Sequence, residues 1–109
     1  MLGKTEELVL LATHKAGSKS TASEIYQTME ATVGRVAAFG AIFTTLERLK
    51  TKGFLTYERG GPRQDYGGRM PRLYTLTGDG VRVLSASMAM TSKMAEGLEL
   101  PEPEVARAV

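Results

Sequence analysis

The 109-residue sequence contains no cysteine and no tryptophan, and His14 is its only histidine. The absence of cysteine excludes a disulfide framework and a thiolate metal site, and it fits a reducing compartment. A single histidine also removes most nucleophile–base pairs and most zinc sites. The acidic residues are scattered, with no pair that the sequence brings together. We therefore predict that the protein is not an enzyme and needs no metal or cofactor, and we place His14 on a helix surface.

Long apolar runs are absent as well. No segment approaches the ~20 apolar residues of a membrane-spanning helix, and the N-terminus lacks the basic and apolar regions of a signal peptide. The length of the chain fits one domain with a real but modest core. We therefore expect a soluble, cytoplasmic protein with no membrane partner.

Positive charge is concentrated in the middle of the chain. The net charge of the whole chain is only +2. Residues 35–72 carry eight basic and three acidic side chains, a net +5, which leaves the rest of the chain at −3. Such a local basic segment is typical of a surface that faces a polyanion, but it is also typical of a solvated face. Charge alone leaves both interpretations open.

Two helices are predicted before the basic segment. Residues 5–16 begin with acids, end with a lysine and are followed by Gly17, which is the usual punctuation of a helix. Thr21 and Glu24 form a capping-box pattern at the start of a second helix, residues 22 to about 31.

A third helix, residues 39–52, has the clearest pattern. Its apolar residues recur at three- and four-residue steps, and Gly53 follows as a left-handed cap. The opposite face is small and polar at its start and basic at its end. Gly40 costs helix stability of order 1 kcal/mol relative to alanine, which suggests that something approaches this end of the helix closely.

Two strands and a long loop follow. Residues 54–58 and 72–76 alternate in polarity and are joined by a loop that leaves no room for a crossover helix, so we predict an antiparallel hairpin. The loop and its margins carry four glycines, two prolines and four arginines. A glycine-rich loop lets the backbone lie close to phosphates, and the arginines could then bind them.

The C-terminal part is predicted to be one long helix and a tail. Thr77 caps the helix, and its apolar residues fall along one side at near-heptad spacing. A helix of ~18 residues extends about 27 Å, so part of it should project beyond so small a domain. The tail from Gly97 is acidic and punctuated by proline, and we expect it to be disordered.

Three helices followed by a hairpin and a long helix is the plan of a winged helix-turn-helix. We predict an α+β, mainly α fold, with a DNA-binding domain at residues 1–76, a dimerisation helix at 77–96 and a disordered acidic tail at 97–109. In this plan the third helix enters the major groove and the hairpin loop forms the wing.

Three segments also resemble the PadR family of bacterial transcriptional regulators: LGKTEELVLLA, FGAIFTTLERLKTKGFL and GGRMPRLYTLTGDGVRVL. The resemblance covers roughly residues 2–84, in matching order and spacing. It implies a homodimer that binds palindromic operator DNA and usually represses transcription. It also implies that the fourth helix dimerises with help from the first. The family's frequent tyrosine is Phe43 here, which removes a hydroxyl that could reach a phosphate.

These arguments give two sets of candidate residues. The predicted DNA contacts lie in the third helix, just ahead of it and in the wing: Arg35, Phe39, Gly40, Ala41, Phe43, Thr44, Thr45, Arg48, Lys52, Arg69 and Arg72. The predicted dimer contacts are Leu8, Val81, Leu84, Met88, Thr91, Met94 and Ala95. Each DNA contact has an alternative. Thr44 and Thr45 could be exposed helix residues without a function, and Arg69 and Arg72 could be solvated loop charges. Arg48 and Lys52 could pair with acids on the same surface.

Two further questions stay open in the sequence. Some PadR proteins bind planar effectors between subunits, often on a tryptophan, which this chain lacks. Either it has no small hydrophobic effector, or methionine, phenylalanine and leucine line the site instead. A different function, protein interaction through the methionine-rich helix, is the alternative to specific DNA binding. In that case the basic segment would bind DNA only weakly and without sequence preference.

Overall fold

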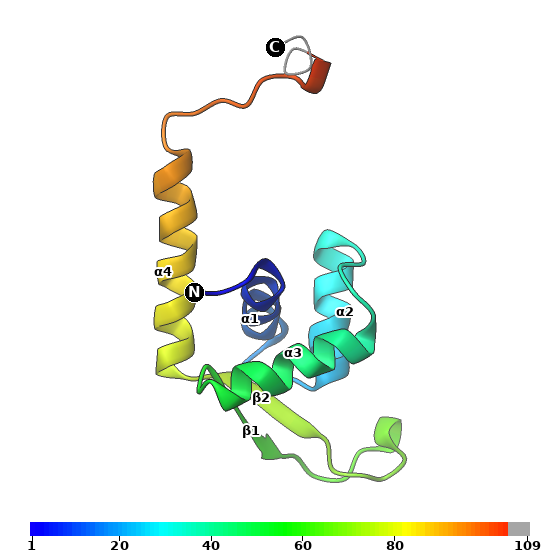
Figure 1. Cartoon of the computed structure of the whole chain (residues 1–109). Helices are drawn as coiled ribbons and strands as arrows, with labels where there is room; N and C mark the ends of the chain where they lie inside the picture. Colours follow the sequence, from blue (N-terminus) through cyan, green and yellow to red (C-terminus); the bar gives the residue numbers. More distant parts are fainter. Residues whose placement is uncertain (105–109) are drawn as a thin grey trace.

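The computed structural model describes residues 1–104 and is mainly helical, with one two-stranded sheet (Figure 1). This confirms the predicted fold class. In chain order the elements are α1 (Lys4–Ala16), α2 (Ala22–Val33), α3 (Phe39–Thr51), β1 (Leu55–Arg59), the short 3-10 helix η1 (Gln64–Tyr66), β2 (Arg72–Leu76) and α4 (Gly78–Ala95).

The helix ends follow the local signals of the sequence. The Thr21 hydroxyl accepts a hydrogen bond from the Glu24 backbone N–H at 3.1 Å, and the Glu24 carboxylate accepts one from the Thr21 N–H at 2.8 Å. The predicted capping box of α2 is therefore confirmed. Thr77 caps α4 in the same manner by accepting from the Gly80 N–H at 3.0 Å. Gly53 follows α3 at φ +84°, a conformation that favours glycine.

The wing is an antiparallel hairpin, as predicted. β1 and β2 pair in the register Leu55↔Leu76, Tyr57↔Tyr74 and Arg59↔Arg72. The turn before α2 extends this pairing, because Ser20 exchanges two backbone hydrogen bonds with Tyr74, at 2.7 and 3.1 Å. Neither this bridge nor η1 within the loop was expected from the residue pattern. Together they attach the wing to the helical body at its base and shape its tip.

The core lies where α1, α2 and α3 meet the inner face of the hairpin. Eight of its side chains are at most 2% exposed: Val9, Leu10, Ile25, Ile42, Leu46, Leu49, Leu55 and Tyr74. The apolar stripe predicted for the third helix supplies three of them, so the outer side of α3 is left to face away from the body.

The long helix α4 stands beside α1, and its C-terminal half rises past the other helices (Figure 1). Leu84 is buried against the core, and the Ser87 hydroxyl donates a hydrogen bond to Glu7 Oε1 of α1 at 2.8 Å. At its start α4 approaches the residue just before β1 so closely that a Cβ on Gly80 would lie 2.1 Å from the Phe54 carbonyl oxygen.

The segment after α4 has no regular element over residues 98–102, and its leucines are exposed. Residues 105–109 of the predicted disordered tail lie outside the described residues. Within residues 1–104, no helix has both the length and the apolar character needed to cross a membrane.

Candidate nucleic-acid interface

The first half of α3 presents its outer face to solvent. Phe39 is 42% exposed and Phe43 36% exposed, although both are large and apolar. Gly40 has open space where a side chain would begin, since apart from its chain neighbours and the adjacent helix backbone no atom lies within 4 Å of that point. Ala41 and Thr44 are exposed beside them. The structure thus leaves this end of α3 accessible, and nothing within the described chain approaches Gly40.

The two exposed rings are held in place by their neighbours. Phe39 makes an edge-to-face contact with Tyr26 of α2, with ring centroids 5.5 Å apart. The Arg72 guanidinium lies 5.8 Å from the Phe43 ring centroid. Such contacts restrict the rings without burying them. The accessible face of α3 therefore has a defined shape.

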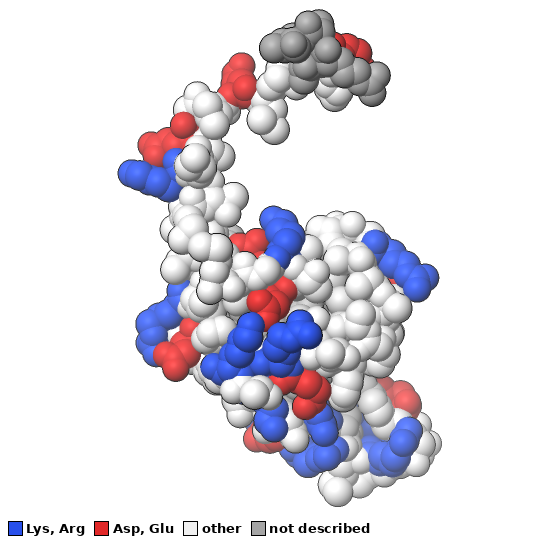
Figure 2. Space-filling view, viewed as in Figure 1, with Lys and Arg blue, Asp and Glu red and all other residues white. Residues whose placement is uncertain are grey.

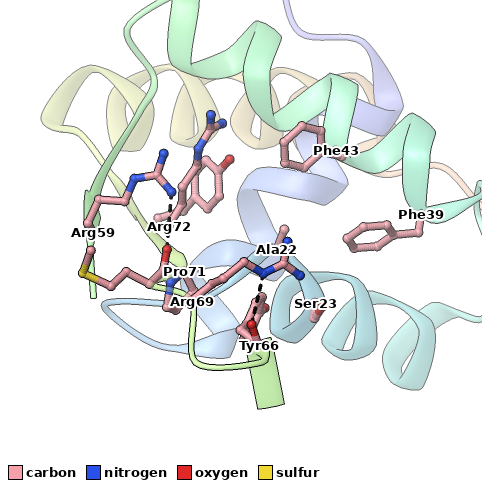
Figure 3. Close-up of a pocket in the computed structure, with 11 residues that line it drawn as sticks. Ala22, Ser23, Phe39, Phe43, Arg59, Tyr66, Arg69, Pro71 and Arg72 are labelled. Atoms are coloured by element: carbon pink, nitrogen blue, oxygen red, sulfur yellow. Dashed lines mark hydrogen bonds between the residues drawn. The ribbon is translucent and has the colours of Figure 1, made fainter. Parts of the chain in front are cut away.

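A groove of about 530 Å³ separates this face from the wing (Figure 3). Phe39 and Phe43 line it from α3, Ala22 and Ser23 from the start of α2, and the rest of the lining comes from the wing. The wing residues are Arg59, Tyr66, Arg69, Met70, Pro71, Arg72 and Tyr74. Aromatic rings and guanidinium groups thus share one open groove, a composition suited to a nucleic-acid backbone.

The wing tip holds Arg69 at the rim of this groove. The Arg69 side chain is exposed, and its Nε donates to the Tyr66 carbonyl oxygen at 3.1 Å. Within residues 1–104 no carboxylate forms an ion pair with it. Arg63 differs, because both its Nε and its Nη2 donate to Asp65, at 3.1 and 2.8 Å. Arg69 therefore keeps its charge available, whereas the charge of Arg63 is largely offset.

Two other predicted contacts are already engaged within the chain. Lys52 Nζ lies 2.7 Å from Glu6 Oε2 of α1, so the alternative interpretation, pairing with an acid, holds for Lys52. This hydrogen bond from Lys52 lowers the pKa of Glu6. Arg72 pairs with Glu47 of α3. Burial raises the pKa of the Tyr74 phenol, which stays protonated and donates to Glu47 Oε1 at 3.1 Å.

The remaining predicted contacts divide by exposure. Thr45 is only 6% exposed, and its hydroxyl donates to the Ala41 carbonyl oxygen at 2.9 Å, so it belongs to the inner side of α3. Thr44 is exposed, with its hydroxyl donating to the Gly40 carbonyl oxygen. Arg35 and Arg48 are also exposed, and no ion pair engages them among the described residues.

Basic side chains gather over α3 and the wing, whereas the middle of α4, residues 83–92, is uncharged (Figure 2). Lys50 and Arg59 were missing from the predicted set, although their charges were counted. Lys50 Nζ lies 5.0 Å and the Arg59 guanidinium 6.0 Å from the Tyr57 ring centroid. The strand register, which sets Arg59 opposite Arg72, was the signal that could have placed Arg59 in the groove.

The predicted dimer contacts fall into three groups. Leu84 packs into the core of its own chain, at 8% exposure, which limits what it can offer a partner. Val81, Met88 and Met94 are exposed apolar residues, and Thr91 and Ala95 are exposed beside them. Leu8 lines a separate groove of about 360 Å³ between α1 and α2, which is mostly apolar.

Metal ligands do not cluster in the described part of the chain. Among residues 1–104, no three His, Asp or Glu side chains lie together in a way that could hold an ion.

Comparison with known proteins agrees with this geometry. The family model described as penicillinase repressor matches residues 2–101. A PadR-like transcription factor from Bacteroides fragilis is 30% identical, with a TM-score of 0.70, over 84% of this chain and 82% of that one. No curated protein matches the chain.

Two less similar structures share the fold. Bacillus subtilis PadR, solved in complex with operator DNA, is 21% identical with a TM-score of 0.65 over 91% of this chain and 51% of that one. Bordetella bronchiseptica BpsR, whose DNA binding is regulated by 6-hydroxynicotinic acid, is 22% identical with a TM-score of 0.59 over 98% of this chain and 74% of that one. From the family model and the 30% identity, the chain belongs to the PadR family of winged-helix transcriptional regulators.

Proposed function

We propose that this DNA-binding regulator recognises a palindromic operator as a homodimer, with α3 in the major groove and the wing on the flanking backbone. One observation carries the proposal. The outer face of the first half of α3 is exposed, and its two phenylalanine rings line the same groove as the wing arginine Arg69 (Figure 3). A base-reading element thus lies beside a phosphate-binding element, which a specific interface requires.

The proposed contacts follow the exposed residues of that surface. Phe39 and Phe43 offer apolar contact to thymine methyl groups, and the Gly40–Ala41 backbone permits close approach to the bases. Thr44, Arg48 and Arg69 offer contacts to phosphates, and Arg35 lies ahead of the helix start, where phosphate is favoured. We leave Thr45 out of this set because it is buried, and Lys52 because it pairs with Glu6.

The dimer is proposed to form through α4. Val81, Met88 and Met94 are exposed apolar residues on a helix that rises past its own core (Figure 1). Pairing two such helices would bury them and relate two copies of α3 by a two-fold axis. Recognition helices related in this way enter successive major grooves roughly 34 Å apart, hence the palindrome.

Repression is proposed from the description of the matching family model as a penicillinase repressor. We place the protein in the bacterial cytoplasm, where a regulator meets its operator. A small-molecule effector is proposed as well, because the DNA binding of BpsR is regulated by one, 6-hydroxynicotinic acid. The mostly apolar groove that Leu8 lines would suit a hydrophobic effector.

Fluorescence anisotropy tests the main proposal. The purified protein is titrated against a duplex from its own promoter region and a scrambled duplex, at two salt concentrations. Binding near ~10⁻⁸ M with ~10³-fold discrimination would support a specific regulator. Equal, weak binding to every promoter duplex tried would contradict it.

That negative result would favour the second candidate, a protein-interaction module. The observation behind it is the exposure of Met88, Met90 and Met94, the last at 82%. Methionine is flexible and suits adaptable protein contacts. Such a module would stay monomeric alone and gain a partner through α4, whereas the proposed regulator dimerises without one.

A further inference from the structure

The proposed recognition helix α3 carries one carboxylate, Glu47, and this carboxylate is engaged by the wing. Glu47 projects from α3 toward the wing, where it pairs with Arg72 and accepts the Tyr74 hydroxyl at 3.1 Å. The two wing partners are close neighbours on β2, so this one side chain ties α3 to the hairpin. Among residues 1–104, no other side chain of α3 forms an ion pair with the wing.

Arg72 is restrained on several sides. Its guanidinium lies 4.6 Å from the Tyr57 ring centroid and 5.8 Å from the Phe43 ring centroid, in addition to the pair with Glu47. The Arg72 side chain is 29% exposed and the Glu47 side chain 37%, so the pair lies between the surface and the core. An arginine that is stacked and charge-paired in this way has little freedom to follow a phosphate.

Arg69 shows the opposite arrangement three residues earlier. It is exposed, it has no carboxylate partner among the described residues, and only its Nε is engaged, with a backbone carbonyl. The wing therefore contains two arginines of different kinds. Arg69 can bind phosphate directly, whereas Arg72 holds the wing against α3.

We propose that Glu47 is a specificity-determining residue, which holds Arg72 as a positioning residue between α3 and the wing and withholds its charge from the DNA backbone. This inference rests on the proposed function. Phosphate contacts add affinity for any sequence, whereas base contacts need a fixed docking geometry. By fixing the wing relative to α3, the pair favours the one geometry in which both elements fit. By neutralising Arg72, it weakens binding to other sequences.

The test compares Glu47→Gln with the wild-type homodimer on promoter and scrambled duplexes over a salt series. Releasing Arg72 should raise affinity for scrambled DNA several-fold and steepen its salt dependence by about 0.9 for each additional phosphate bound. Affinity for the promoter duplex should stay level or fall, so the discrimination between the two duplexes decreases. An equal change on both duplexes, or no change, would overturn the proposal.

Glu30→Gln is the matched control, because Glu30 also accepts a tyrosine hydroxyl, from Tyr26 at 3.1 Å, but pairs with no arginine among the described residues. Glu30→Gln removes the same charge and should change the affinity for both duplexes equally. Glu47→Gln should raise the affinity for scrambled DNA more than Glu30→Gln does. This additional increase should vanish in the double variant that also carries Arg72→Gln. An excess that persists in the double variant would mean that Arg72 is not the released group.

Arg72→Gln alone gives an independent answer. If Arg72 only positions the wing, this variant loses discrimination but keeps the wild-type salt slope. A slope reduced as much as in Arg69→Ala would identify Arg72 as a phosphate ligand and overturn the proposal. Failure of the proposed function looks different, because the wild type itself would then not discriminate. In that case the salt slope on scrambled DNA still tests whether Glu47 withholds Arg72.

Discussion

Replacing Gly80 by alanine tests how α4 is attached to the winged helix. An added Cβ would meet the backbone of Phe54, at 2.1 Å from the carbonyl oxygen and 3.0 Å from the carbonyl carbon. The backbone cannot yield easily, because this carbonyl also accepts a hydrogen bond from the Thr77 N–H at 3.1 Å. The Thr77 hydroxyl donates to the neighbouring Gly53 carbonyl oxygen at 2.6 Å. The start of α4 would therefore have to move away from β1.

The expected loss of stability follows from two opposing effects. Overpacking costs about 1–3 kcal/mol, and contact with a pinned backbone carbonyl places this case toward the upper end. Alanine regains at most about 1 kcal/mol of helix propensity. We expect a net loss of about 2 kcal/mol, which lowers the melting temperature by about 10 °C in a domain of this size.

Gly78 provides a control in the same turn of α4. A Cβ there would lie 3.6 Å from the tip of the Arg82 side chain, which is ordinary contact with a flexible group. Gly78→Ala should therefore melt at the wild-type temperature or slightly above it. Circular dichroism melts should use equal protomer concentrations, because the proposed dimerisation would make the midpoint concentration-dependent. If Gly80→Ala has the same melting temperature as the wild type and Gly78→Ala, the packing argument is wrong.

Three further predictions concern charge and assembly. Arg69→Ala should weaken binding to all sequences alike. It should also lower the salt slope, measured by anisotropy over a salt series, by about 0.9 for each phosphate that the wing no longer binds. An unchanged slope would contradict the proposed wing contact. Met88→Glu should dissociate the proposed dimer in sedimentation, while Ala89→Glu, on another side of α4, should leave it intact. Equal behaviour of the two variants would contradict dimerisation through the Met88 side of α4. Because Lys52 lowers the pKa of Glu6 in the folded state, this carboxylate stabilises the fold above its unfolded pKa, and the contribution disappears as pH falls through the lower folded pKa. Glu6→Gln should therefore lower the free energy of unfolding by about 1 kcal/mol at neutral pH. In denaturant melts this difference from the wild type should shrink in acid. A difference that is constant with pH would refute the assignment.

Local signals in the sequence were enough to predict the four α-helices and the two strands, but not η1. The capping box at Thr21, the cap at Thr77 and the left-handed Gly53 each act within a few residues, and all three are present. The hairpin followed because its loop leaves no room for another connection. None of these inferences required knowledge of a distant contact.

The candidate site was harder to predict because its charges are paired over long sequence distances. Lys52 pairs with Glu6 and Arg72 with Glu47, 46 and 25 residues apart. A count of charges along the chain treats all of these side chains as available. Helix periodicity likewise placed Thr45 on the outer face, but in the packed structure it turns toward the core. Only the three-dimensional arrangement separates the exposed cations from those that hold the fold together.

The start of α1 links the two functional parts of the molecule. Its adjacent carboxylates diverge, since Glu6 pairs with Lys52 at the end of α3 while Glu7 accepts the Ser87 hydroxyl of α4 at 2.8 Å. Gly80 adds a second junction, between α4 and Phe54 in the turn that joins α3 to β1. In a dimer built on α4, these junctions would fix the position of each α3 relative to the two-fold axis. The contacts within each chain would then determine the distance between the two recognition helices as much as the interface does. This distance in turn sets the spacing of the operator half-sites.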